Sequence, residues 1–182
     1  AVVAFVLAAG LIGAGIAQRT IFQGPASQTV TVEVADPAPF VLMDGEVLRE
    51  NPGAQTLEIR GEGEIFAAYG RTADMEAWLS DTEYNHVTAG GAGELDVEFV
   101  EATVDDAATE PASEETPGDG APGEAAEGRS PVGSDLWLDS FTEVDSMDTD
   151  LQLPEGVSVL ISYDGVQDAP DDISLSWPLD NS

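Results

Sequence analysis

Histidine and cysteine, the side chains most often used for catalysis and zinc binding, are almost absent from this sequence. His86 is its one histidine, and cysteine is absent. A zinc site needs several nitrogen or sulfur ligands, and a catalytic histidine needs an oriented acid and a nucleophile. Ser80 and Asp81 precede His86 closely, but no serine lies in a nucleophile-elbow pattern. We therefore expect no catalytic residue and no cofactor, and we expect His86 to lie at a strand edge or to act as a pH-sensitive surface group.

Carboxylates are abundant, and two clusters of them occupy short stretches. Asp145, Asp148 and Asp150 resemble a fragment of a calcium loop, but the glycine at its sixth position and its closing glutamate are missing. The second cluster consists of Asp168, Asp171 and Asp172. Each cluster is typical of a solvated loop, with a weak calcium site as the alternative. Because acids occur throughout the chain, no pair stands out for glycoside hydrolysis, and we predict no metal centre.

Positive side chains are rare, with five arginines and no lysine. Three of them, Arg60, Arg71 and Arg129, lie in acidic surroundings, where neutralising nearby carboxylates is the simplest role. Arg71 also lies between a predicted strand and a predicted helix, close in sequence to Tyr69 and Trp78. Arg71, Tyr69 and Trp78 are therefore the candidate contact for a ligand or partner, such as an anion or an envelope polymer.

The formal net charge of -31 at pH 7 excludes some partners. Nucleic acid is not an expected partner, because its phosphates would be repelled. Anionic lipid headgroups would be repelled as well, so the acidic part should stand off a bilayer. The charge favours solubility, weak cation binding or a basic partner.

Residues 1–17 contrast with this acidity because they contain no charged side chain. A helix of that length rises about 26 Å, against a hydrocarbon core of about 30 Å. Since the chain starts without methionine, we expect residues 1–19 to be a transmembrane anchor truncated at its start. A cleaved signal peptide and a buried helix of a soluble protein are the alternatives. Ala9, Gly13 and Ala17 lie four apart and predict a face that contacts another membrane helix.

Alternating apolar and polar residues predict strands through residues 24–101, the first part of a β-rich domain. In residues 29–34, Val30, Val32 and Val34 share one face. Further strands are predicted at residues 56–60, 65–69, 84–87 and 94–100.

Two turns and one helix interrupt these strands. Residues 40–48 contain Asp-Gly between apolar runs, which predicts a hairpin, and residues 61–63 predict a turn. Residues 73–79 place Met75 near Trp78 and Leu79 on one face, which predicts a short helix capped by Thr72 and docked on the sheet.

A change of composition divides the chain after the first set of strands. Residues 102–128 contain no aromatic and no basic residue, which predicts a disordered acidic insert. Residues 129–182 would form a marginal core alone, so we expect them to complete the same domain, with strands at residues 157–163 and 173–177. The pattern predicts a mainly β fold, a small β-sandwich or barrel-like domain with one short helix.

Three segments carry a resemblance to a known family: AAYGRTADMEAWLSDTEYNHV, GRSPVGSDLWLD and SWPLDNS. They resemble a family of uncharacterised actinobacterial envelope membrane proteins, often loosely labelled "glycosyltransferase" or "membrane protein". The resemblance implies a membrane helix, an extracytoplasmic β-rich domain with an acidic variable insert, and a second helix after Ser182. It implies no catalytic residues, and the sequence gives the glycosyltransferase label no support.

These patterns predict a location more directly than an activity. We expect a membrane-tethered, extracytoplasmic module of a bacterial cell envelope that binds or scaffolds another component without catalysis. Its expected partners are the lipid bilayer, through residues 1–17, and another membrane helix or envelope protein. An enzyme or accessory subunit acting on envelope glycans is one alternative, and a sensor domain for cations or pH is another.

Overall fold

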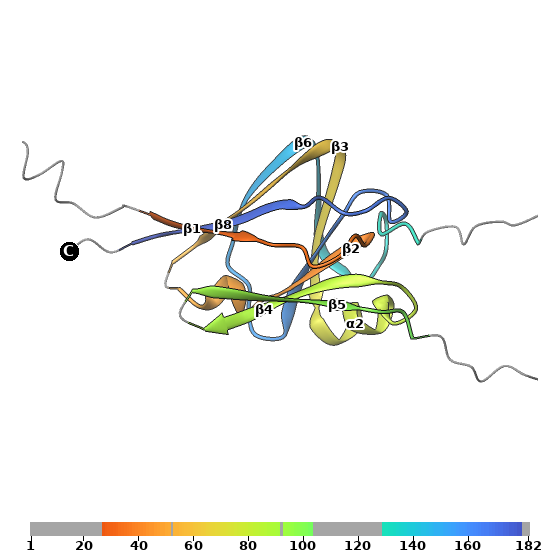
Figure 1. Cartoon of the computed structure of the whole chain (residues 1–182), viewed down its shortest axis with the longest axis horizontal. Helices are drawn as coiled ribbons and strands as arrows, with labels where there is room; N and C mark the ends of the chain where they lie inside the picture. The colour runs from red at the N-terminus through yellow and green to blue at the C-terminus, as the bar shows by residue number, and fades with distance from the viewer. Residues whose placement is uncertain (1–26, 52, 92, 104–128, 180–182) are drawn as a thin grey trace, which may run out of the picture.

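The computed structural model describes residues 27–51, 53–91, 93–103 and 129–179. They form a mainly β domain, a nearly closed, barrel-like sheet with one α-helix (Figure 1). This confirms the predicted mainly β class and, of the two predicted architectures, fits the barrel-like one. Its elements are β1 (Ser27–Val32), β2 (Phe40–Asp44), η1 (Val47–Arg49), β3 (Gln55–Arg71), α2 (Thr72–Leu79), β4 (Tyr84–Gly91), β5 (Glu94–Val100), β6 (Trp137–Leu151), β7 (Val157–Ser162) and β8 (Asp172–Pro178).

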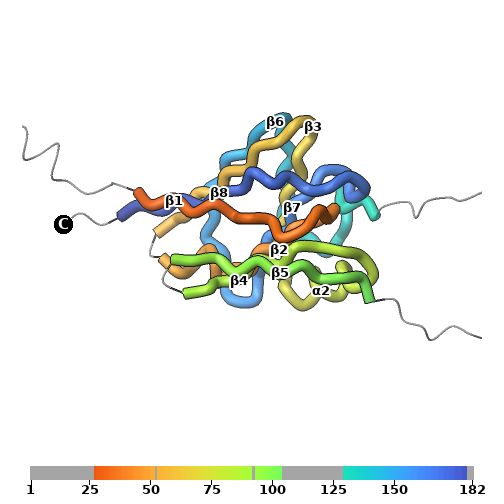
Figure 2. Tube along the Cα trace, viewed as in Figure 1, coloured from red at the N-terminus to blue at the C-terminus, as the bar shows by residue number. Residues whose placement is uncertain are grey.

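The sheet curls until its two ends approach each other. Its strand order is β1-β8-β3-β7-β2-β4-β5, and β6 pairs with β3 beside this path. Neighbouring strands are antiparallel except β2 and β4, which are parallel. β1 and β5 end the order within the described residues, yet they lie side by side in both views (Figures 1 and 2). The barrel is therefore open at the β1–β5 seam.

One long, bent strand joins the two parts of the curled sheet. β3 is continuous, so the turn predicted at residues 61–63 is wrong. The register of β3 with β6 shifts between Arg60 and Glu64, and Gly63 has a φ of 108°. This irregularity is a bulge, which bends a strand without ending it. As a result, the first half of β3 pairs with β8 and its second half pairs with β7.

Side chains from the sheet form two apolar clusters on opposite faces. The interior of the barrel holds the larger cluster, in which Val41, Ile59 and Ile161 are fully buried. On the outer face, Met75 and Leu79 of α2 pack against a second cluster that includes Phe40, Leu42 and Leu160. Each fully buried side chain of this size contributes about 1.5–3 kcal/mol. The predicted docking of the helix on the sheet is confirmed.

Two other local predictions are wrong. The hairpin predicted for residues 40–48 does not form, because β2 pairs with β4 and β7 and is followed by the 3-10 helix η1. Thr72 is not the helix cap: it is the first helical residue, and Arg71 precedes it without a side-chain capping bond. The Thr72 hydroxyl instead lies 2.7 Å from Ser158 Oγ on β7, which attaches the start of α2 to the sheet.

Several predicted features lie outside the described residues. They are the anchor at residues 1–19, its Ala9, Gly13 and Ala17 face, and residues 104–128 of the predicted insert. In the part of the chain that the structure describes, no helix combines the length and the apolar character needed to cross a membrane.

Candidate binding site

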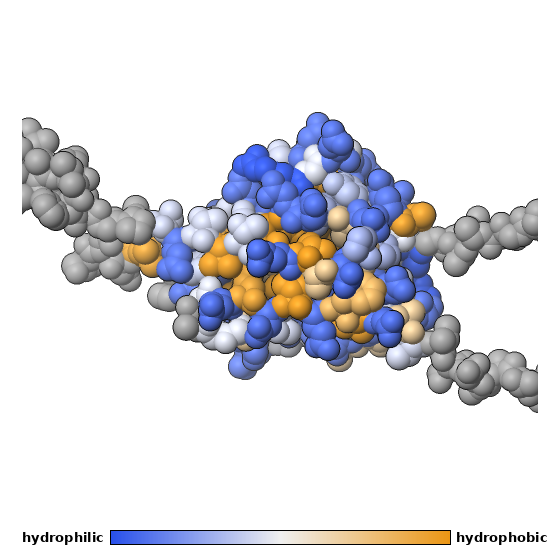
Figure 3. Space-filling model, in the orientation of Figure 1, coloured by the Kyte–Doolittle hydropathy of each residue, from blue (hydrophilic) through white to orange (hydrophobic). Residues whose placement is uncertain are grey.

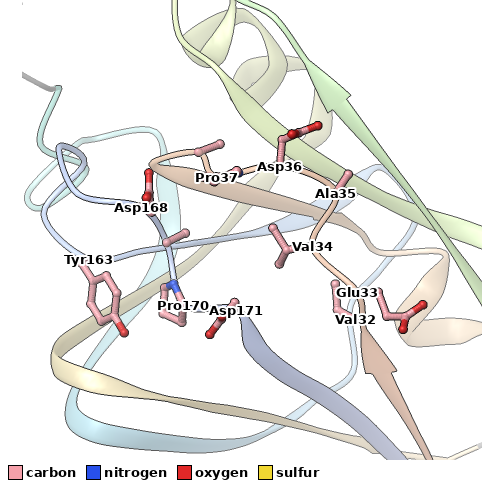
Figure 4. A pocket seen from close by; sticks show the side chains of 12 residues that line it. Val32, Glu33, Val34, Ala35, Asp36, Pro37, Tyr163, Asp168, Pro170 and Asp171 are labelled. Atoms are coloured by element: carbon pink, nitrogen blue, oxygen red, sulfur yellow. The ribbon is translucent and has the colours of Figure 1, made fainter.

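An open pocket of about 550 Å³ lies where the β1–β2 connection faces the β7–β8 connection. Residues 32–38 form one wall, and Tyr163 with residues 168–171 forms the other. Figure 4 shows the two connections facing each other, with Val34 between them and Tyr163 on the far side. We call this surface the acidic pocket, because its polar lining is dominated by carboxylates.

Hydrogen bonds from the fold hold both walls in place. Asn85 on β4 is fully buried, and its Oδ1 accepts the backbone N–H groups of Ala35 at 3.1 Å and Asp36 at 3.3 Å. Its Nδ2 donates to the carbonyl of Asp36 at 2.7 Å. The backbone N–H of Ala169 donates to the carbonyl of Ala38 at 2.8 Å and ties one wall to the other. Contacts within the fold therefore determine the shape of the pocket.

None of the described residues that line the acidic pocket is basic. Its four carboxylates, from Glu33, Asp36, Asp168 and Asp171, are all on exposed residues. Carboxylates of one sign gathered in a depression produce a local negative potential, which attracts cations.

The arginines of the described residues are largely occupied elsewhere. Three ion pairs use them: Arg49 with Glu155, Arg60 with Glu58, and Arg129 with Asp81. These pairs confirm the neutralising role predicted for Arg60 and Arg129. Among the described residues, no arginine lines the acidic pocket, so its charge is available to a partner.

A second depression, the edge groove, continues from the acidic pocket along β1. It measures about 390 Å³ and is lined by Val30, Thr31 and Glu33 on one side and by residues 93–95 and Val97 on the other. Glu33 lines both depressions. Figure 3 shows apolar side chains exposed on this face, over the seam between β1 and β5. The two depressions together form one elongated surface.

The structure separates the residues of the predicted Arg71 contact. Tyr69 packs against the larger apolar cluster inside the barrel, the main core, and its ring centroid lies 6.1 Å from that of Phe141. Trp78 belongs to the cluster beneath α2, on the opposite face of the sheet. Arg71 is exposed at the end of β3. The three side chains therefore do not form a single contact surface.

Trp78 belongs instead to an aromatic cluster covered by an arginine. Its ring centroid lies 5.3 Å from that of Phe40 and 5.5 Å from that of Trp137, both edge-on. The guanidinium of Arg129 lies 5.2 Å from the Trp78 ring centroid and donates to the Trp78 carbonyl at 2.6 Å. With its ring engaged in this way, Trp78 is a poor stacking platform for a sugar.

His86 lies in a polar network on the outer face of the sheet. Its Nε2 is 3.1 Å from Asp44 Oδ1, which also accepts a hydrogen bond from Ser158 at 3.2 Å. Asp44 therefore lies between the histidine and the serine, whereas base-assisted attack needs the histidine next to the nucleophile. Burial, and then nearby carboxylates, raise the pKa of Tyr84, whose ring centroid lies 6.1 Å from that of His86.

The first aspartate cluster is in a strand, so the calcium-loop alternative does not fit. Asp145 and Asp150 both lie on β6. Asp145 Oδ1 accepts the N–H of Gly63 at 3.0 Å, and Asp150 Oδ1 accepts the Thr56 hydroxyl at 2.6 Å. These carboxylates support the pairing of β6 with β3. Within the residues that the structure describes, no group of three or more metal-ligating side chains could hold a metal ion.

The second aspartate cluster contributes to the site that sequence reasoning missed. Asp168 and Asp171 line the acidic pocket, whereas Asp172 begins β8. Their proximity to Glu33 depends on long-range strand pairing, which no local pattern reveals. Asn85 did carry a signal, as the one amide in the otherwise strand-like stretch Tyr-Asn-His-Val.

No protein-family model, curated protein or solved structure matches this chain. The resemblance to actinobacterial envelope proteins therefore stays a prediction. The features that bear on function are the acidic pocket, the edge groove and the charge of the described surface.

Proposed function

We propose that this protein is a membrane-tethered, extracytoplasmic binding module of a bacterial cell envelope, and that its β domain binds a basic partner. The observation that carries the proposal is the acidic pocket, whose described lining has four carboxylates and no basic side chain. A segment rich in lysine or arginine complements such a surface and gains in association rate and specificity. Because the charges are exposed, binding weakens as salt rises.

The membrane tether and the extracytoplasmic location in this proposal are inferred from the sequence alone. Residues 1–17 would anchor the domain in the bilayer, and the face of Ala9, Gly13 and Ala17 would contact another membrane helix. Because the chain has no cysteine, Ser140→Cys on the exposed face of β6 introduces a unique label. An impermeant maleimide should label this variant in intact cells. Labelling that requires lysis would contradict the extracytoplasmic location.

Binding of a basic partner can be tested with pentalysine as the probe. The full chain in neutral detergent is titrated calorimetrically at low and physiological salt. Asp168→Asn/Asp171→Asn should weaken binding about tenfold, since each exposed charge contact contributes up to about 1 kcal/mol.

The matched control removes the same charge from β6, which lines neither depression. Asp139→Asn/Asp148→Asn should change the affinity much less, because both residues are exposed on that strand. Equal weakening by the two double variants would show diffuse attraction to an acidic surface and would refute a pocket.

A further inference from the structure

The edge groove lies between two strand edges that have no partner among the described residues. β1 pairs with β8 on one side and β5 pairs with β4 on one side, and no strand in the described ranges pairs with their facing edges. Free strand edges expose backbone N–H and C=O groups that can accept another strand. Strand addition to such an edge is a recurring mode of peptide recognition.

The side chains of β5 alternate between the groove and solvent. Leu95 and Val97 are half-buried and pack against the main core, whereas Glu94, Asp96 and Glu98 are exposed. The outward face of β5 is therefore a row of carboxylates at every second residue. Successive residues of a strand face opposite sides of a sheet, so a strand paired with β5 would meet this row on its outward face.

The floor of the groove is apolar. Val30 on β1 faces Leu95 and Val97 across the seam, and all three remain only partly buried. In Figure 3 hydrophobic side chains gather on this face. Covering them would complete the core at the seam between β1 and β5.

We propose that the edge groove binds an extended segment of a partner protein in which apolar residues alternate with lysine or arginine. The segment adds as a strand to the free edge of β5. Its apolar side chains cover Val30, Leu95 and Val97, and its cationic side chains meet the carboxylate row of β5. This inference rests on the basic partner of the proposed function and adds the partner's conformation and sequence pattern.

Charge argues for a basic partner over a second copy of this chain. Two copies, each with a formal charge of -31, would bring the carboxylate row of β5 against another acidic surface. Like charges placed opposite each other across strands are destabilising. A cationic segment removes this repulsion.

The width of the seam sets a structural requirement. Cα atoms of β1 and β5 come within 8 Å of each other, whereas strands on both sides of an inserted strand lie about 9.6 Å apart. The closest part of the seam must therefore widen by at least about 1.6 Å if the segment also reaches β1.

The test uses the full chain in neutral detergent and a synthetic peptide that alternates valine and lysine. A peptide of the same composition with the lysines in one block is the sequence control. In each of two further peptides, three alternate backbone amides are N-methylated. One peptide carries the methyl groups on odd-numbered residues and the other on even-numbered residues. Affinity is measured by fluorescence anisotropy, and hydrogen exchange reports the amides of β1 and β5.

The alternating peptide should bind at least about tenfold tighter than the block peptide, because only it matches the period of β5. Three lost backbone hydrogen bonds should weaken one N-methylated peptide by about 100-fold. Binding should slow exchange along β5. Glu33→Lys/Glu94→Lys should weaken binding more than the control Asp139→Lys/Asp148→Lys on β6.

Three outcomes would overturn strand addition. They are equal affinity of the alternating and block peptides, tolerance of both N-methylated peptides, and protection of the β5 edge before peptide is added. The last outcome would show that a second copy or another part of the chain already covers the groove. If pentalysine still binds, only strand addition fails; if neither probe binds at low salt, the proposed function fails too.

Discussion

Asn85 offers a direct test of how the barrel builds the acidic pocket. Its side chain makes three hydrogen bonds to the backbone of residues 35–36, and the residue is fully buried. Asn85→Ala removes all three bonds and leaves their backbone partners without the amide. Each bond contributes about 0.5–1.5 kcal/mol, so the free energy of unfolding should fall by about 2–4 kcal/mol.

Urea unfolding followed by circular dichroism measures this loss, and an unchanged slope would show that the native fold is retained. Hydrogen exchange gives the local counterpart, because the amides of Ala35 and Asp36 should lose protection in the folded variant. Gln152→Ala removes an exposed amide side chain from the β6–β7 connection and serves as the control, with an expected change within about 0.5 kcal/mol.

A loss below about 1 kcal/mol, together with unchanged protection at Ala35 and Asp36, would refute this role of Asn85. That result would mean that the β1–β2 connection holds its shape without Asn85. Conversely, a folded variant with a released connection should bind pentalysine more weakly, since residues 32–38 form one wall of the acidic pocket.

Three further changes test the packing and the turns. Met75→Ala empties a fully buried position between α2 and the sheet and should cost about 2–5 kcal/mol in urea unfolding, whereas the exposed Glu76→Ala should change little. Gly45→Ala would drive a methyl group into the carbonyl of Val157, so the thermal midpoint should fall; an unchanged midpoint would contradict this close approach. Asp164 accepts two backbone N–H groups that follow it, at 2.9 and 3.0 Å, and this hydrogen bonding lowers its pKa. Its stabilisation is therefore present above the ordinary value of about 4 and is lost as pH falls through the lower folded value, so the stability difference between wild type and Asp164→Ala should shrink on acidification. A difference that stays constant down to pH 2 would contradict the lowered pKa.

Local periodicity was sufficient to predict most elements of this fold. Val30 and Val32 alternate with polar residues in β1, and Ile173 and Leu175 do so in β8, because each strand has one face on the core. The short helix was predicted for the same reason, since the apolar face of α2 must be buried. These patterns depend only on neighbouring residues, which is why the sequence reveals them.

The errors arose where distant contacts decide the structure. Residues 61–63 have the composition of a turn, but β6, β7 and β8 pair with the flanking segments and keep β3 continuous. Residues 145–150 are too acidic to look like a strand, yet β3 pairs with residues 146–150, and Asp145 lies at the register shift. The acidic pocket also depends on distant contacts, because its two walls come from segments that are far apart in the sequence. A single sequence contains no local record of such pairing.

The acidity of the chain and its open seam are linked by the same physical problem. A strand edge left unpaired invites association with other copies, and proteins commonly protect such edges with charge. Here Glu94, Asp96 and Glu98 project outward along the edge strand β5, so a second copy of the chain would be repelled there. The repulsion does not apply to a basic segment, for which the same carboxylates become the attraction. In the proposed function, one row of side chains would disfavour pairing with a second copy of the chain and favour a basic partner.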